Sequence, residues 1–435
     1  MAADTATLTP PAVVGLSERA LTFSRAAALL AVLLVALRIN LGQGVSVGHV
    51  LTLVLSPLWF PALRRYTGGL WIAGVGVLAT LASIWLTILS STDHETSPSN
   101  LVANTILVTG TASGIAVLFW ARELLPAWLI GTVYGFGLLV DVVTHQAVLG
   151  YNQGSGGQIN VWKFALAVPL AILTLSLAQR ARRRWVAIAV LLVLALISAR
   201  LDSRSYFGEF IIAALLVIWQ MLPLGRRHGS APRVLLGFGI VVAAIYNIGT
   251  SLVLGGALGE ETQARSVEQV QRAGSILVGG RPEMGATAAL FLSRPVGFGA
   301  GTLANNADLI TAQNGMRQVN YDPENGYVEN FLFGKQIELH SMVGDLWTYS
   351  GFAGIAFAII CMVLLLVVIG RGMASRAMTA VLLFTVVQSF WNMFFNPLLA
   401  SAPVLVFALG LGLTLRRGKT PPSAPADSRR EMTAV

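Results

Sequence analysis

Long apolar stretches separated by short polar loops recur along almost the whole of this 435-residue chain. Most are close to the roughly 20 residues that an α-helix needs to cross a bilayer. Only 11% of the residues are charged, against about 25% in a typical soluble domain. The pattern predicts an all-α integral membrane protein with about twelve transmembrane helices. The predicted spans fall at about residues 23–41, 47–63, 68–90, 101–120, 124–144, 161–178, 185–200, 206–223, 234–256, 342–369, 376–395 and 399–415.

The basic residues predict which loops face the cytoplasm. If the N-terminus lies inside, every even-numbered loop carries arginine, and most of the 29 lysine and arginine residues fall on that side. Cytoplasmic loops of membrane proteins are enriched in lysine and arginine in this way. We therefore expect a multi-pass protein of the cytoplasmic (inner) membrane, with both termini in the cytoplasm. Polar residues of functional interest are then expected to converge on the extracytoplasmic side.

A long polar interval divides the apolar stretches into two groups. Both ends of the chain are polar and rich in proline, which predicts unfolded cytoplasmic tails. A polar segment this long, held between spans, is where chemistry on a water-soluble group is expected. The predicted divisions are a tail over 1–22, spans one to nine over 23–256, a large extracytoplasmic loop over 257–340, spans ten to twelve over 341–415, and a tail over 416–435.

Two arginines on the predicted outer side suit a phosphate-bearing ligand. Arg204 opens the eighth span, where the free N–H groups and the dipole of a helix favour an anion. Arg281 follows two glycines in the long loop, and its planar fork matches phosphate oxygens. The hairpin before Arg204 also contains Arg200 and Asp202, and an alternative is that these two form a self-contained pair that caps the turn.

His340 is the candidate catalytic base. It stands immediately before the tenth span, with Glu338 two residues earlier and Asp345 five residues later. A neutral imidazole can take a proton from a hydroxyl group. An alternative is a histidine that only caps a helix at the lipid interface. The residues that would support the site are Arg200, Asp202, Glu338 and Asp345.

Several kinds of chemistry lack their motifs. The chain has one cysteine, Cys361, and no Cys/His spacing typical of a metal site. It also has neither a phosphate-binding Gly-rich loop with Lys-Ser/Thr nor a carboxylate pair suited to a nucleotide-bound metal at the outer face. We therefore expect no metal, no cofactor, no nucleotide-sugar donor and no nucleic-acid partner.

Three stretches, in this order, resemble the O-antigen ligase/polymerase (WaaL/Wzy-like) family of polytopic membrane glycosyltransferases. They are DSRSYFGEF at 202–210, GGRPEMGATAALFLSRPVGFGAG at 279–301 and LHSMVGDLWTYSGFAGIAF at 339–357, and they cover roughly the second half of the chain. The resemblance implies a GT-C-like fold and transfer of a glycan from a polyprenyl diphosphate carrier without a metal. It also implies that Arg204 and Arg281 hold the donor diphosphate and that His340 is the base. Ser341 stands where many members have asparagine.

The expected function is therefore transfer or polymerisation of a glycan, with ligase and polymerase both open. The expected partners are a polyprenyl-diphosphate-linked glycan, a glycan or glycolipid acceptor with a free hydroxyl, and membrane lipids. One alternative is a transporter or flippase of a lipid-linked saccharide, which predicts internal repeats and charges at mid-membrane in both halves. Another is a GT-C enzyme with a monophosphate donor, which predicts an acidic residue in the first outer loop, LGQGVSVG, where there is none.

Overall fold

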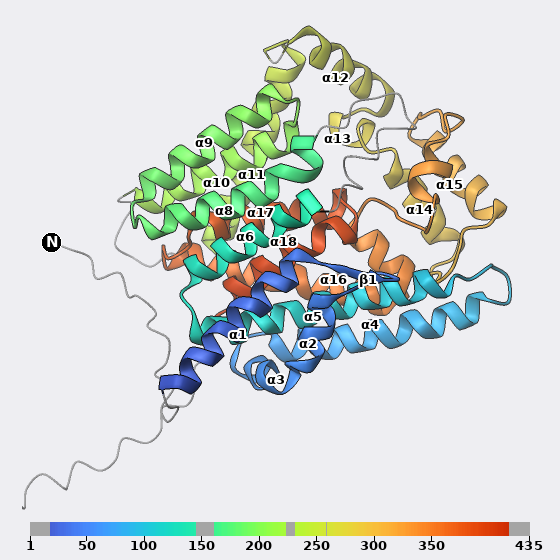
Figure 1. The fold of residues 1–435 in the computed structure, drawn as a ribbon. Coiled ribbons are helices and arrows are strands. Elements are labelled where there is room, and N and C mark those ends of the chain that lie inside the picture. Colours follow the sequence, from blue (N-terminus) through green and yellow to red (C-terminus); the bar gives the residue numbers. More distant parts are fainter. Residues whose placement is uncertain (1–17, 145–160, 223–230, 258, 417–435) are drawn as a thin grey trace, which may run out of the picture.

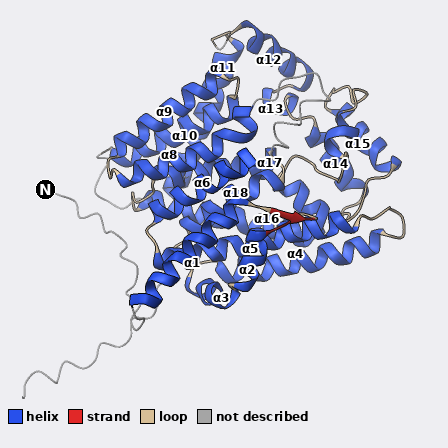
Figure 2. Ribbon diagram, viewed as in Figure 1, coloured by secondary structure: helices blue, strands red, loops and turns tan. Residues whose placement is uncertain are grey.

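The computed structural model describes residues 18–144, 161–222, 231–257 and 259–416 (Figure 1). Figure 2 shows that this part of the chain is almost entirely helical, with one short hairpin of two strands. The all-α class predicted from the apolar pattern is therefore confirmed. The predicted Gly-rich outer loop at 145–160 and most of both predicted tails lie outside the described residues.

The described residues up to 144 form six helices and the hairpin. Helix α1 begins at Glu18, inside the segment predicted as a tail, and a carboxylate suits the positive end of a helix dipole. The predicted span 47–63 is two helices bent by 75° at a break next to Pro57. The elements are α1 Glu18–Leu37, β1 Asn40–Gly42, β2 Val45–Ser46, α2 Val47–Val54, α3 Ser56–Arg65, α4 Gly69–Ser90, α5 Pro98–Leu124 and α6 Ala127–Thr144.

The described residues from 161 onward supply the remaining bundle helices. One of them, α16, contains a kink at Gly351, whose φ of 58° interrupts the helical backbone. The elements are the π-helical turn η2 Trp162–Leu166, α8 Ala167–Arg180, α9 Arg184–Arg200, α10 Arg204–Met221, α11 Ala231–Leu254, α16 Met342–Ala374, α17 Ala380–Phe395 and α18 Leu398–Gly412.

The length and apolar composition of the helices are those of a membrane protein. Among the described residues, six helices are long and apolar enough to cross a bilayer, or seven if α2 and α3 together count as one span. Helices α17 and α18 have 16 and 15 residues. At 1.5 Å per residue they fall short of a hydrocarbon core of about 30 Å. Every predicted apolar stretch therefore has a helical counterpart, while the number of twelve spans stays a prediction.

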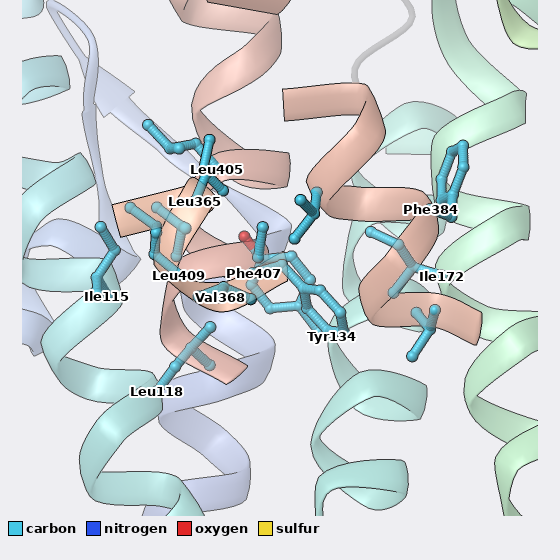
Figure 3. Close-up of a cluster of buried hydrophobic side chains, with 14 of the residues drawn as sticks. Ile115, Leu118, Tyr134, Ile172, Leu365, Val368, Phe384, Leu405, Phe407 and Leu409 are labelled. Atoms are coloured by element: carbon cyan, nitrogen blue, oxygen red, sulfur yellow. The ribbon is translucent and has the colours of Figure 1, made fainter. Parts of the chain in front are cut away.

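The bundle is held together by large apolar side chains from helices far apart in the sequence. Figure 3 shows side chains of α5, α6, α8, α16, α17 and α18 meeting around Phe407 and Tyr134. The Tyr134 hydroxyl donates to the Pro403 carbonyl of α18 at 2.9 Å. This bond satisfies the one polar atom that the tyrosine brings into the core.

The segment over 257–340 is a folded helical unit. Its helices lie along one side of the bundle, at the top and right of Figure 1. They include a small core of their own, with Leu290, Met316 and Leu332 fully buried against Trp347 of α16. The elements are α12 Glu260–Ala273, α13 Ile276–Gly279, α14 Glu283–Ser293, α15 Asn306–Gln318 and the π-helical turn η3 Val328–Leu332.

Loops that the charge pattern assigns to one side are in contact with one another. At one end, the Arg416 amide donates to the Arg65 carbonyl at 2.7 Å, and Arg65 pairs with Glu123. At the other, Thr96 forms a β-bridge with Thr302 of the long segment. These contacts join loops that the charge pattern places on the same side. Which group faces the cytoplasm stays a prediction.

The stretch 295–302 inserts as irregular backbone between α4 and α16. The amides of Phe298 and Gly299 both donate to the Thr348 carbonyl at 2.9 Å, and the Asn104 side chain donates to the Ala300 carbonyl at 2.9 Å. Irregular backbone inside an apolar bundle must have its polar groups satisfied by protein. The glycines of this stretch allow its backbone to pack closely against α4 and α16.

Gly299 is the position in this stretch where a side chain is least tolerable. Its φ is 104°, and a Cβ would lie 2.3 Å from the Thr87 amide nitrogen. We predict that Gly299→Ala costs at least about 2 kcal/mol through backbone strain and overpacking. Thermal unfolding in detergent measures this. Gly74→Ala, in open space on α4, is the matched control, and equal melting temperatures for the two variants would contradict the prediction.

Candidate functional site

Arg281 lies between α13 and α14, at the junction of the 257–340 segment and the bundle. Its Nη1 is 3.3 Å from Glu283 Oε1, and its guanidinium lies over the Phe395 ring, 5.7 Å from the ring centre. The Arg281 side chain is 21% exposed and that of Glu283 is 5% exposed. Arg281 is therefore held at the end of α17 by an aromatic ring and one carboxylate, with part of its guanidinium accessible.

Lys163 is a third cation that the sequence analysis did not single out. It lies on the π-helical turn η2 and interacts electrostatically with Arg281 and Arg204, and also with Asp202 and Glu283. Single π-turns inside helices occur frequently at functional sites. A lysine within an apolar run was the available signal, because an intramembrane charge is costly unless it has a role.

Arg204 borders a pocket of about 330 Å³ formed by the hairpin and α12. Its Nη1 donates to Ser266 Oγ of α12 at 2.8 Å. Arg200 and Asp202 also line this pocket. Asp202 pairs with Arg265 of α12 at 3.0 Å, so the hairpin is tied to the 257–340 segment rather than being a self-contained turn.

His340 is connected to Arg281 through two further side chains. His340 Nδ1 lies 3.3 Å from the Tyr327 hydroxyl, and Tyr327 is hydrogen-bonded to Glu283, the partner of Arg281. Burial raises the pKa of Tyr327, and the nearby Glu283 carboxylate raises it further. The phenol therefore stays protonated and donates to Glu283. Its oxygen then accepts from Nδ1–H of His340, which leaves the lone pair of the neutral imidazole on Nε2.

The backbone around His340 is fixed by Asp345 and Ser341. Asp345, 1% exposed, accepts from the amides of Leu339 and Leu398, each at 2.7 Å. Ser341 caps α16 by accepting from the Gly344 amide at 2.9 Å. His340 itself has a φ of 52°, a left-handed conformation that is uncommon outside glycine and often found at functional sites. Asp345 thus supports His340 through the backbone.

Glu338 lies on the approach to His340. Its Oε2 accepts from the side-chain amide of Gln336 at 3.2 Å, and its backbone N–H donates to the Leu332 carbonyl. It also interacts electrostatically with Asp345. The structure therefore brings the predicted residues to one end of the bundle in two connected groups. One group consists of Arg281, Glu338, His340 and Asp345. The other consists of Arg200, Asp202 and Arg204. Lys163 interacts electrostatically with Arg281 of the first group and with Arg204 of the second.

A separate polar cluster joins the loop after α4 to the start of α15. His94 is 4% exposed, with Nδ1 2.8 Å from Asp93 and Nε2 2.9 Å from Asp308. Arg294 pairs with Asp93 at 2.7 Å and lowers the pKa of that carboxyl to about 2 through hydrogen bonding. Every member of this cluster has protein partners, so we assign it to holding the 295–302 stretch in place.

Among the described residues, no group of three or more His, Cys, Asp or Glu side chains is arranged to hold a metal ion. The polar groups of the site include Lys163, Arg204, Arg281, His340 and the Tyr327–Glu283 link. Comparison with protein-family models, with curated proteins and with solved structures found no match to this chain.

Proposed function

We propose that this protein is a membrane glycosyltransferase that transfers or polymerises a glycan from a polyprenyl-diphosphate-linked donor onto an acceptor hydroxyl, in the manner of O-antigen ligases and polymerases. One observation carries the proposal. Lys163, Arg204 and Arg281 share one end of an apolar bundle, and His340 is linked to Arg281 through Tyr327 and Glu283. Such a site suits a ligand with an apolar tail and a strongly anionic head.

The arrangement supports a single displacement. The acceptor hydroxyl gives its proton to Nε2 of His340 while its oxygen bonds to the anomeric carbon of the donor. The bond from that carbon to the diphosphate oxygen breaks, and its electron pair leaves with the lipid diphosphate. Cations placed where this charge develops stabilise the transition state. A direct displacement of this kind inverts the anomeric centre.

The proposal is tested by transfer with purified components. The protein in lipid nanodiscs would receive a synthetic polyprenyl-diphosphate glycan and a set of glycan and glycolipid acceptors, with and without EDTA. We expect a transferred product that is unaffected by EDTA, because side-chain cations provide the positive charge. Binding of the donor without any transfer would overturn the proposal. Movement of the lipid across proteoliposome membranes, again without transfer, would favour a flippase.

A further inference from the structure

Glu209 is a buried carboxylate whose oxygens are not satisfied by the protein. It lies on the second turn of α10 and is 3% exposed, and neither oxygen has a hydrogen-bond partner among the described residues. Arg281 acts on it electrostatically. A buried carboxylate without donors is expensive. Ionisable residues at membrane depth that persist despite this cost commonly face a ligand.

A second buried acceptor without a partner among the described residues lies on α17, which packs against α10. Gln388 of α17 is 1% exposed, and its Oε1 has no hydrogen-bond partner among the described residues. Its amide group is hydrogen-bonded to Tyr206 of α10, which also interacts with Glu209. Gln388 and Glu209 are therefore connected across the α10–α17 contact through Tyr206.

The polar surface continues from Gln388 to the position of Arg281. Gln388 donates to Asn392 at 3.1 Å, and Asn396 donates to the same Asn392 oxygen at 2.6 Å. The residue before Asn396 is Phe395, on whose ring Arg281 lies. A row of hydrogen-bonded amide side chains thus runs from Gln388 to the C-terminal end of α17, where Arg281 lies over Phe395.

We propose that Glu209 and Gln388 bind the first sugar of the lipid-linked donor, the one attached to the diphosphate. The two carboxylate oxygens of Glu209 and Oε1 of Gln388 accept hydrogen bonds from hydroxyl or amide hydrogens of that sugar. The location follows from connectivity, because the first sugar is bonded directly to the diphosphate that Arg281 holds. Three buried oxygens, two of Glu209 and one of Gln388, lack partners among the described residues, and a sugar ring supplies several hydroxyl donors close together.

The inference rests on the proposed function and deepens it, so its test separates the sugar from the diphosphate. The probes are polyprenyl diphosphate alone and polyprenyl diphosphate carrying one sugar, in the parent form and as single deoxy analogues. Binding to the protein in nanodiscs is measured by titration. We expect the wild type to bind the sugar-bearing lipid more tightly than polyprenyl diphosphate alone, and we call this difference in affinity the sugar gain. Glu209→Gln should reduce the sugar gain by roughly 10- to 100-fold. Binding of polyprenyl diphosphate alone stays unchanged.

The deoxy analogues and a control variant complete the design. At least one deoxy analogue should bind the wild type more weakly than the parent lipid does. The same analogue and the parent lipid should bind Glu209→Gln with equal affinity, because the missing hydroxyl is the one from which Glu209 accepts a hydrogen bond. Gln388→Met should lose a smaller part of the gain. Gln220→Met is the control on α10. The Gln220 side-chain amide is hydrogen-bonded to the backbone of Met378. This variant should therefore have a lower melting temperature but still bind the sugar-bearing lipid more tightly than polyprenyl diphosphate alone.

The possible failures are distinguishable. If the wild type does not bind polyprenyl diphosphate at all, the proposed function falls and this inference falls with it. If the diphosphate binds and the sugar gain is equal in wild type and Glu209→Gln, only this inference is overturned. A lower melting temperature in Glu209→Gln, with weaker binding of polyprenyl diphosphate alone, would also overturn it, because Glu209 would then be a counter-ion of Arg281.

Discussion

Replacing Arg281 by alanine is expected to slow glycan transfer by about 10²–10³-fold, the usual cost of removing one preorganised donor from a site of developing negative charge. Arg281 is partly exposed, held over Phe395 and paired with Glu283, so its guanidinium can reach a ligand without rearrangement. The measurement is the single-turnover rate with saturating donor. Binding of polyprenyl diphosphate should weaken in parallel.

Two further variants separate a lost ligand contact from a damaged fold. Arg281→Ala leaves Glu283 without its ion pair, and a buried carboxylate that loses its partner lowers stability. Arg281→Lys keeps a charge but not the planar fork, so it should fold normally and give an intermediate rate. Arg317→Ala removes an exposed cation paired with Glu324 and should leave transfer unchanged. An Arg281→Lys rate equal to the wild type would remove Arg281 from the phosphate site.

Much of the architecture follows from patterns that a sequence displays directly. Apolar runs of bilayer length predict helices because a backbone in lipid must satisfy its own hydrogen bonds. All twelve predicted runs are helical in the structure. The break between α2 and α3 was missed, although Pro57 at the start of α3 was its signal. The packing of the helices in the 257–340 segment was not predicted, because it depends on contacts between elements that are distant in the sequence.

The site was predictable where a residue stands out against its surroundings. Arg204 was identified at the start of a helix, Arg281 after two glycines and His340 immediately before a span. Lys163, Tyr327 and Glu283 were not, since their part in the site depends on contacts between distant elements. Glu283 joins Arg281 to Tyr327 through tertiary geometry alone. Tyr327 resembled any interfacial aromatic residue, and only its 3.3 Å contact with His340 distinguishes it.

Replacing His340 by asparagine is expected to reduce transfer by about 10²–10⁴-fold, the usual contribution of a positioned general base. Asparagine is the appropriate substitute because position 340 has a φ of 52°, and asparagine tolerates this conformation better than alanine does. Donor binding should stay unchanged, because the cations that hold the diphosphate remain. The measurement is the transfer rate together with binding of polyprenyl diphosphate.

Chemical rescue then distinguishes a base from a residue that only shapes the loop. Glycine accepts a positive φ without strain, so His340→Gly should fold, lose transfer and regain part of it when free imidazole is added. Tyr327→Phe removes the hydroxyl next to His340 Nδ1 and should cost about tenfold, since the imidazole loses its orienting partner but not its lone pair. If His340→Asn keeps wild-type transfer, the base must be another group. If imidazole restores no transfer while the protein stays folded, His340 is a positioning residue and not the base. The link through Tyr327 to Glu283 would then hold the backbone conformation at position 340 and would not orient the imidazole for proton transfer.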